Sequence, residues 1–420
     1  MRVELLAVGT ELLLGDIVNG NAAWLGRRLA EAGLDVTTSV VVGDNVTRIG
    51  DALRQALTRA DAVVLTGGLG PTQDDVTREA LAAVAGVPIQ RDVAVERLLR
   101  AHFESLGRAV PERNYRQADV PEGAVPLPNT RGTAPGLRME LPGGVAYALP
   151  GPPHEMEAMF DACVLPDLLE RAGEPSVIVS RVLRTAGMWE SAVAEALAGL
   201  VEELEPAGNP TIAFLASGGQ TRVRISAKAA TCEDALRLLA PVEQAARDCL
   251  GENVYGDEHD TLAGVVHARL RQRDATLAVA ESLTAGALGA ALTDVVGSGV
   301  AFRGGVTAYA TDLKNSLLGV PSSLLQTLGP VSGEVAVAMA EGVRTRLGAT
   351  YGLSLTGVAG PDEQDGKPVG LVYAGLAWPG GATVRELHLG GDRPRIRVLA
   401  TVNALDLLRR HLCRPDPDAG

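Results

Sequence analysis

An alternation of short apolar strands with helical patterns runs through the first 173 residues and limits the folds open to them. The strands read VELLAVG, VTTSVVVG and DAVVLTGGLG, and the helical stretches between them read NAAWLGRRLAEAG and IGDALRQALTRA. Parallel strands need a crossover connection, usually a helix, so this order predicts a mostly parallel sheet covered by helices. In open sheets of this kind ligands bind beyond the carboxyl ends of the strands, where the glycines of this segment lie.

The chain of 420 residues is too long for one ordinary core, and its pattern predicts three domains, over residues 1–173, 174–257 and 258–420. The middle segment follows the order strand, helix, strand, strand, helix. It carries no cluster of reactive side chains, which favours a spacer or dimerisation module. The last segment opens with the helical stretch TLAGVVHARLRQR, and the tail RPDPDAG is expected to fray.

Charge and cysteine usage narrow the class of ligand. A net charge of −13 without a dense Lys/Arg tract argues against direct contact with nucleic acid. Cys163, Cys232, Cys249 and Cys413 form no C-x-x-C pair, so neither a zinc site nor a disulfide framework is expected, and a reducing cytoplasm fits. MRVELLAVGTELLLGD reads as a first strand and not as a signal peptide, and no stretch is suited to cross a bilayer.

The stretch AESLTAG, directly after the apolar run from Ala275 to Ala280, leaves two interpretations of Ser282 open. A serine between a strand and a helix can cap the helix by accepting one of its first N–H groups. It can also be a nucleophile, with backbone N–H groups around Thr284 to Gly286 holding an oxyanion.

Lys314 falls in the first turn of the helix predicted by TDLKNSLLG. The positive end of the helix dipole disfavours an ammonium group there, burial would have the same effect on its pKa, and a neutral lysine can act as a base. Tyr309, just before that helix, is a second candidate to relay a proton. The three residues together suit acyl transfer without a histidine or a metal. Taken singly, a capping serine, a surface lysine and a core tyrosine remain the alternative.

Residues 258–420 resemble the nicotinamide-nucleotide amidase domain at the carboxyl end of CinA-family proteins (competence/damage-inducible protein A). The matching motifs stand in the family's order as AESLTAG, GSGVAFRGGVTAYATDLK, GPVSGEVAVAMAEGVR, TGVAGPDEQDGKPVG and GDRPRIRVLA. The resemblance implies metal-free deamidation of nicotinamide mononucleotide to nicotinic acid mononucleotide and ammonia. It implies Ser282 as the nucleophile and Tyr309 and Lys314 as its activating partners. The family's substrate-binding turn corresponds to Thr356, Gly357, Ala359 and Gly360. The family usually has ESCTGG and YSNEAK where this chain has ESLTAG and YATDLK.

The strongest local pattern of the first segment is LTGGLGPTQDDVTREA, residues 65–80. Gly67, Gly68 and Gly70 allow the backbone to approach a ligand closely, and the start of a helix favours phosphate. Asp74 and Asp75 can hold a divalent metal that bridges phosphate oxygens, or they can be first-turn dipole and capping residues around a tight turn. Further polar groups follow strands or lie in glycine-rich loops: Thr10, Glu11, Asp16, Asn19, Asp44, Asn45, Thr133 and Glu155.

TGGLGPTQDD, GTAPG and LPGPPHEM are similar to the amino-terminal domain of CinA proteins, which shares the fold of molybdopterin-binding enzymes. RTAGMWES and PTIAFLASGGQTRVRISAKA match the family's small α+β, KH-like linking domain. The resemblance implies a three-layer α/β first domain that cleaves ADP-ribose to AMP and ribose 5-phosphate with a divalent metal, Mg²⁺ or Co²⁺. Its metal ligands would be Asp74 and Asp75, with Glu155 as a further candidate. Substrate contacts are expected from Thr10, Asn19, Asp44, Gly67, Gly68, Gly70 and Thr133.

The sequence therefore predicts a cytoplasmic, homodimeric, bifunctional enzyme of pyridine-nucleotide recycling, with small-molecule nucleotides as ligands. The alternative is a sensor that binds a nucleotide or a pterin and acts through a protein partner in competence or the DNA-damage response.

Overall fold

The computed structural model describes residues 1–173 and 176–414, and the chain divides into two compact units. One unit contains Met1–Val179 and Ala227–Arg237, and the other contains Ser180–Ser226 and Leu238–Gly420. The expected domain boundary at residue 174 and the tail after Arg414 lie outside the described residues. No helix in the described ranges is long and apolar enough to cross a membrane.

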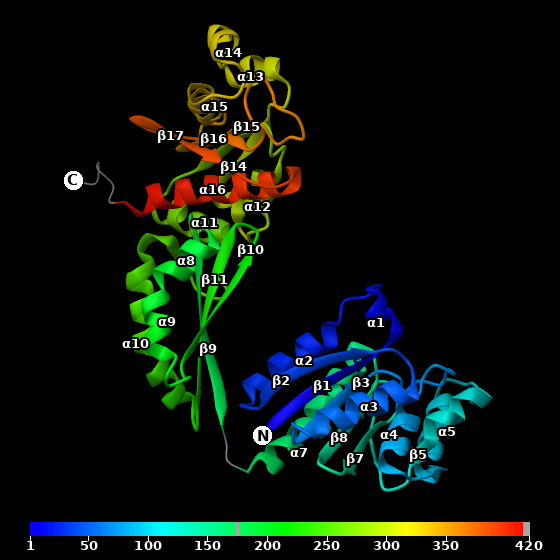
Figure 1. The fold of residues 1–420 in the computed structure, drawn as a ribbon. Coiled ribbons are helices and arrows are strands. Elements are labelled where there is room, and N and C mark those ends of the chain that lie inside the picture. The colour runs from blue at the N-terminus through cyan, green and yellow to red at the C-terminus, as the bar shows by residue number, and fades with distance from the viewer. Residues whose placement is uncertain (174–175, 415–420) are drawn as a thin grey trace. The chain divides into compact units, whose positions relative to one another are not determined.

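The first unit is built on a six-stranded sheet with the order β2-β1-β3-β8-β7-β6 (Figure 1). The first four strands are parallel neighbours and the last two are antiparallel, which confirms the predicted mostly parallel sheet. The strands are β1 Arg2–Val8, β2 Asp35–Val42, β3 Ala62–Thr66, β6 Val125–Leu127, β7 Gly136–Leu141 and β8 Gly144–Leu149. A separate pair is formed by β4 Ile89–Arg91 and β5 Asp119–Pro121.

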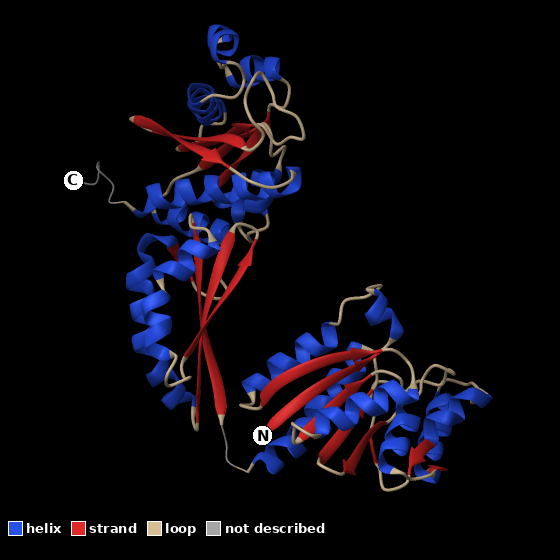
Figure 2. Ribbon diagram, in the orientation of Figure 1, coloured by secondary structure: helices blue, strands red, loops and turns tan. Residues whose placement is uncertain are grey.

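Helices cover both faces of this sheet (Figure 2). Side chains of β1 alternate between two hydrophobic cores: Leu6 and Val8 join Ile49 of α3, while Leu5 joins Leu29 of α2. The domain thus has three layers, as its pattern of βαβ units predicts. The helices are α1 Thr10–Leu14, α2 Gly20–Glu31, α3 Val46–Leu57, α4 Thr77–Ala85, α5 Val93–Ser105, α6 Pro153–Met159 and α7 Leu165–Ala172, with a 3₁₀ helix at Glu112–Ala118 and a π-helical turn at Phe160–Val164.

The KH-like part has a four-stranded sheet with the order β10-β11-β9-β12. Its elements are β9 Val177–Ala186, α8 Glu190–Ala196, α9 Ala198–Leu204, β10 Thr211–Ser217, β11 Gln220–Ala229, α10 Cys232–Leu250, a 3₁₀ turn at Gly251–Asn253 and β12 Val254–Gly256. The order of elements predicted for this segment has one helix after its first strand, but the structure has two there, α8 and α9. They separate at Leu197, whose backbone leaves helical angles (φ −103°, ψ 2°) while its side chain is fully buried.

The carboxyl-terminal part contains a five-stranded sheet with the order β14-β13-β15-β16-β17. The strands are β13 Leu277–Glu281, β14 Phe302–Thr307, β15 Tyr351–Gly357, β16 Leu371–Trp378 and β17 Gly381–His388. The helices are α11 Leu262–Gln272, α12 Ala287–Thr293, α13 Thr311–Leu318, α14 Ser322–Leu328, α15 Gly333–Arg346 and α16 Arg393–Cys413, with a 3₁₀ turn at Ser298–Val300.

Alternate side chains of β13 enter different cores, as a strand buried on both faces requires. Leu277 and Val279 pack with residues of α11 and α16, and Ala278 and Ala280 pack with residues of α13 and α15. Because β14, β13 and β15 are parallel, their carboxyl ends meet at one edge of the sheet. The loops that follow these ends carry the residues singled out from the sequence.

Candidate functional site

A cavity of about 200 Å³ lies at this edge of the carboxyl-terminal sheet. Ser282 enters it directly after β13, and Lys314 enters it from α13. The predicted residues that line it are Ser282, Tyr309, Lys314, Gly357, Ala359 and Gly360. The fold therefore brings both proposed reactive groups and most of the predicted binding turn to one cavity.

Lys314 is buried, with 1% of its surface exposed. Its Nζ donates hydrogen bonds to the carbonyl of Pro330 at 2.8 Å and to Thr356 Oγ1 at 2.7 Å. Burial lowers the pKa of Lys314 to about 8. A neutral amine has two N–H bonds, so these two acceptors leave its lone pair for another partner. Thr356, predicted to bind substrate, is itself fully buried and orients this lysine.

Ser282 is held at the end of β13 by its own N–H, which donates to the Leu355 carbonyl at 2.9 Å. Its side chain does not cap the following helix, because α12 begins at Ala287 and has Gly286 as its N-cap. The capping interpretation is therefore wrong. The Ser282 hydroxyl has no hydrogen-bond partner among the described residues, although 8% of the residue is exposed and it lines the cavity.

Glu281, the last residue of β13, caps α12 instead. Its buried carboxylate accepts N–H bonds from Gly286 at 2.9 Å, Leu288 at 3.0 Å and Gly289 at 2.8 Å. Sequence reasoning missed this role. The available signal was an acid at the end of an otherwise apolar strand, directly before a helix of small residues.

Because of this cap, the prediction that N–H groups around Thr284 to Gly286 hold an oxyanion has to be corrected. Gly286 donates its N–H to Glu281, and Ala285 donates its N–H to the Ser282 carbonyl at 3.1 Å. Neither Thr284 nor Gly286 lines the cavity, and Thr284 Oγ1 is buried without a partner in the described part of the chain.

Two other backbone donors belong to residues that line the cavity. Ala359 and Gly360 line it, and their N–H groups have no acceptor among the described residues. These donors lie in the TGVAG turn, which was predicted to bind substrate. An N–H group that has no acceptor can stabilise a charged oxygen.

Tyr309 lies at the open side of the cavity, with 55% of its surface exposed. Its hydroxyl accepts a hydrogen bond from Arg393 at 2.7 Å, and Arg393 also donates to the Gly360 carbonyl at 2.7 Å. Arg393, at the start of α16, thus ties the tyrosine to the binding turn. The residue lies in the motif GDRPRIRVLA but was not singled out, because nothing local links it to Tyr309.

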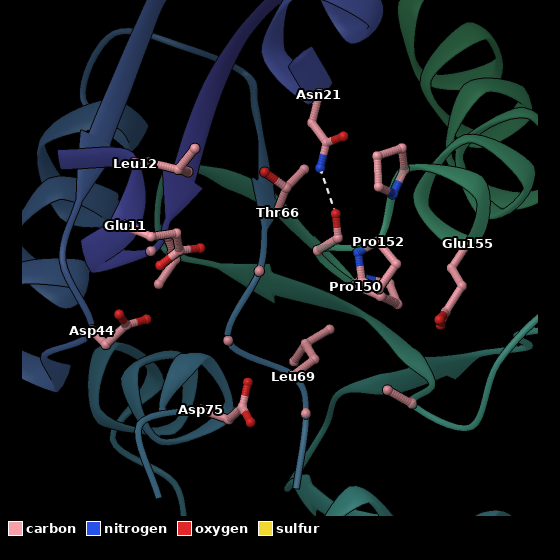
Figure 3. Close-up of a pocket in the computed structure, with 18 of the residues that line it drawn as sticks. Glu11, Leu12, Asn21, Asp44, Thr66, Leu69, Asp75, Pro150, Pro152 and Glu155 are labelled. Carbon is pink, nitrogen blue, oxygen red and sulfur yellow. Dashed lines mark hydrogen bonds between the residues drawn. The ribbon is translucent and has the colours of Figure 1, made fainter. Parts of the chain in front are cut away.

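A second pocket, of about 670 Å³, lies beyond the carboxyl ends of β1 and β3 in the first unit (Figure 3). The predicted residues that line it are Glu11, Asn19, Asp44, Gly67, Gly68, Gly70, Asp74, Asp75, Thr133 and Glu155, whereas Asp16 and Asn45 do not line it. Thr10 does not line the pocket but bonds to Asp44. Asn21, also in the lining, donates to the Gly151 carbonyl at 2.8 Å.

The glycine turn after β3 requires its glycines. Gly67 has φ 97°, and a Cβ there would lie 2.2 Å from the Val8 carbonyl oxygen. The buried guanidinium of Arg78 holds the next part of the turn by donating to the carbonyls of Leu69 at 2.6 Å and Gly70 at 2.8 Å. These two contacts fix the backbone that forms one wall of the pocket.

Asp44 and Asp75 are oriented in the same way. Asp44 Oδ2 accepts both the N–H and the hydroxyl of Thr10, each at 2.8 Å. Asp75 Oδ2 accepts the N–H of Thr72 at 2.8 Å and the Thr72 hydroxyl. Each carboxylate thus uses one oxygen for its threonine and keeps Oδ1 without a hydrogen bond in the described structure. Because α4 begins at Thr77, Asp75 lies before its first turn, in the loop.

The predicted metal ligands are not gathered into one cluster. Glu155 accepts a hydrogen bond from Asn129 at 2.6 Å and lies across the view from Asp75 in Figure 3. Within the described residues, no group of three or more His, Cys, Asp or Glu side chains is placed to hold an ion. Mg²⁺, however, is often bound by one or two carboxylates together with substrate phosphates, and Asp44 and Asp75 fit that requirement.

These features define a multidomain α/β protein with a separate ligand pocket in each unit. Its three parts match three family models: a probable molybdopterin binding domain over residues 4–170, the damage-inducible protein CinA KH domain over 180–256, and the CinA C-terminal domain over 259–412. The chain belongs to the CinA family.

Relatives match over nearly the whole chain. A CinA-like protein of Frankia casuarinae is 63% identical over 98% of this chain and 96% of its own length. A putative competence-damage inducible protein of Desulforamulus reducens is 43% identical over 98% of this chain and 99% of its own. A crystal structure of the protein CinA with unknown function from Thermoplasma acidophilum covers 40% of this chain and 97% of its own, at 36% identity and a TM-score of 0.37.

Proposed function

We propose that the cavity containing Ser282 and Lys314 deamidates nicotinamide mononucleotide to nicotinic acid mononucleotide and ammonia. The observation that carries this proposal is a buried lysine with a pKa of about 8 in the same cavity as a serine that caps nothing. Ammonia release from nicotinamide mononucleotide by the full chain, with a chelator present, is the direct test. A folded protein that binds this nucleotide without releasing ammonia would contradict the proposal.

Each bond change has a group on the chain to serve it. Lys314 accepts the hydroxyl proton as Ser282 Oγ attacks the carboxamide carbon, and the N–H groups of Ala359 and Gly360 stabilise the charged oxygen. The C–N bond then breaks, and the nitrogen leaves as ammonia with the proton that Lys314 returns. Water hydrolyses the resulting ester, which releases the carboxylate product and restores Ser282.

The rate should depend on the protonation of Lys314. Only the neutral amine can accept the serine proton, so kcat/KM is expected to rise as the pH rises through about 8 and to level off above it. The measurement is kcat/KM for ammonia release from about pH 6 to about pH 10. A profile that is flat through this range would exclude Lys314 as the base.

Arg393→Ala should lower kcat/KM about tenfold, because the change removes charge-assisted hydrogen bonds to Tyr309 and Gly360. Arg393→Lys should restore part of the loss. Arg395→Ala, an exposed arginine two positions along the same helix, is the matched control and should leave the rate unchanged. Equal activity of the Arg393 and Arg395 variants would remove Arg393 from the site.

We further propose that the pocket of the first unit hydrolyses ADP-ribose to AMP and ribose 5-phosphate with a divalent cation. The support is the pair of fixed carboxylates, Asp44 and Asp75, beside a glycine turn in one pocket. A bound Mg²⁺ or Co²⁺ would neutralise phosphate charge and polarise the bond that breaks. The chain's own groups would orient the diphosphate against the backbone N–H groups of the turn. Nucleotide binding without turnover would instead identify the sensor alternative.

A further inference from the structure

The second unit has another cavity, at the edge of the five-stranded sheet opposite to Ser282. Its volume is about 820 Å³, and it lies among the start of β15, the turn between β16 and β17, and the end of α16. Strand β15 runs from Tyr351 at this cavity to Gly357 at the amidase cavity. The two cavities are therefore distinct and lie at opposite ends of one strand.

The lining of this second cavity is strongly basic, although the chain as a whole carries a net charge of −13. Its charged residues are Arg273, Arg385, Arg410 and Arg414, with His411 beside them, and none of the described residues that line it is acidic. Among the described residues, those that line the cavity offer an entering anion guanidinium groups and no carboxylate.

Two acids outside the lining neutralise this charge only in part: the buried Asp406, and the exposed Glu252, whose carboxylate lies 3.5 Å from Arg410. Arg385, Arg409 and Arg410 share the single buried carboxylate of Asp406, with N···O distances of 3.5, 2.6 and 2.7 Å. The Arg385 contact is the longest of the three, which leaves most of its N–H donors for another acceptor. Arg414 is exposed and makes no ion pair within the described ranges.

Aromatic rings form the remaining wall. The half-buried ring of Trp378 packs on the His411 ring, with ring centroids 4.2 Å apart. The ring of Tyr351 also contacts His411, with ring centroids 5.6 Å apart. Guanidinium groups bind phosphate in paired hydrogen bonds, and indole rings stack on flat aromatic groups. The cavity thus combines guanidinium groups that can bind a phosphate with an indole ring on which a base can stack, and a nucleotide has both a phosphate and a base.

We propose that this cavity binds a nucleoside phosphate, with the phosphate on Arg385 and Arg414 and the base against Trp378. This site is separate from the amidase and pyrophosphatase pockets and does not depend on either proposed activity.

Fluorescence of Trp378 in the full chain tests the proposal. The other two tryptophans are first replaced, as Trp24→Phe and Trp189→Phe, so that Trp378 alone reports. Titration with AMP should give a saturable change, and inorganic phosphate should bind about tenfold more weakly because it offers nothing to stack. Arg385→Gln with Arg414→Gln should raise the AMP midpoint at least about tenfold.

Arg346→Gln is the matched control, because this exposed arginine of the same part of the chain does not line the cavity. It should leave the midpoint within about twofold. Arg414→Gln alone, at an exposed position, gives the same test if loss of Arg385 impairs folding. An AMP signal that is absent, or unchanged by the arginine substitutions, would overturn the proposal. Equal affinity for phosphate and AMP would overturn the assignment to a nucleotide.

Discussion

Ser282→Ala is expected to reduce ammonia release from nicotinamide mononucleotide at least about 1000-fold. The variant removes the atom that forms the bond to the carboxamide carbon. Among the described residues that line the cavity, Ser282 is the only one that carries a hydroxyl in the loop directly after β13. Folding should be unaffected, because Ser282 caps no helix. Nucleotide affinity should also remain, since the TGVAG turn and Arg393 are unchanged.

Ser332→Ala provides the matched control. Ser332 is a true N-cap, which accepts the Val335 N–H at 3.3 Å, and it does not line the cavity. Its loss should lower the free energy of unfolding by about 1 kcal/mol and leave the rate intact. Lys314→Met should match the loss in Ser282→Ala, and the double variant should be little worse, because the two residues act as one unit. A Ser282→Ala rate within a few-fold of the parent rules out the serine mechanism.

Asp75→Ala should remove metal-dependent turnover of ADP-ribose by about 100-fold or more while ammonia release stays at the parent level. The variant deletes a carboxylate that Thr72 holds in the pocket, and the amidase cavity lies in the other unit. The two activities are measured on the same preparation, by AMP formation and by ammonia release.

Asp51→Asn is the control for loss of charge, because Asp51 is exposed on α3 and does not line the pocket. Thr72→Val tests the orientation of Asp75, because it deletes the hydroxyl bond but keeps the carboxylate; a smaller loss is expected. Unchanged AMP formation by Asp75→Ala would place the cation elsewhere or show that the pocket only binds.

Local pattern was enough to predict the strands and helices around both pockets. Apolar runs at strand spacing and capped amphipathic stretches located β1, β3, β13 and α13, and the parallel order brought their carboxyl ends together. The homodimer, the cytoplasmic location, the metal and the domain boundaries stay predictions.

Contacts between distant segments could not be predicted. Arg393 reaches Tyr309 across 84 positions in the chain, and Thr10 reaches Asp44 across 34. Glu281 was missed for another reason, although its three N–H partners lie close to it in sequence. Serine is among the preferred N-cap residues, so Ser282 was considered as the cap and the neighbouring glutamate was not. The sequence left open whether Lys314 is buried or on the surface, and its acceptors on Pro330 and Thr356 required the packed fold.

The threonine contacts of Asp44 and Asp75 also bear on which ion suits the pocket. With Oδ2 occupied, each carboxylate can offer a cation only one oxygen. Ca²⁺ takes six to eight ligands and readily accepts both oxygens of a carboxylate, whereas Mg²⁺ is octahedral and keeps several waters. Single-oxygen carboxylates therefore favour the smaller ion. The two threonines would thus act on the choice of ion indirectly, by limiting how many carboxylate oxygens the pocket can offer it.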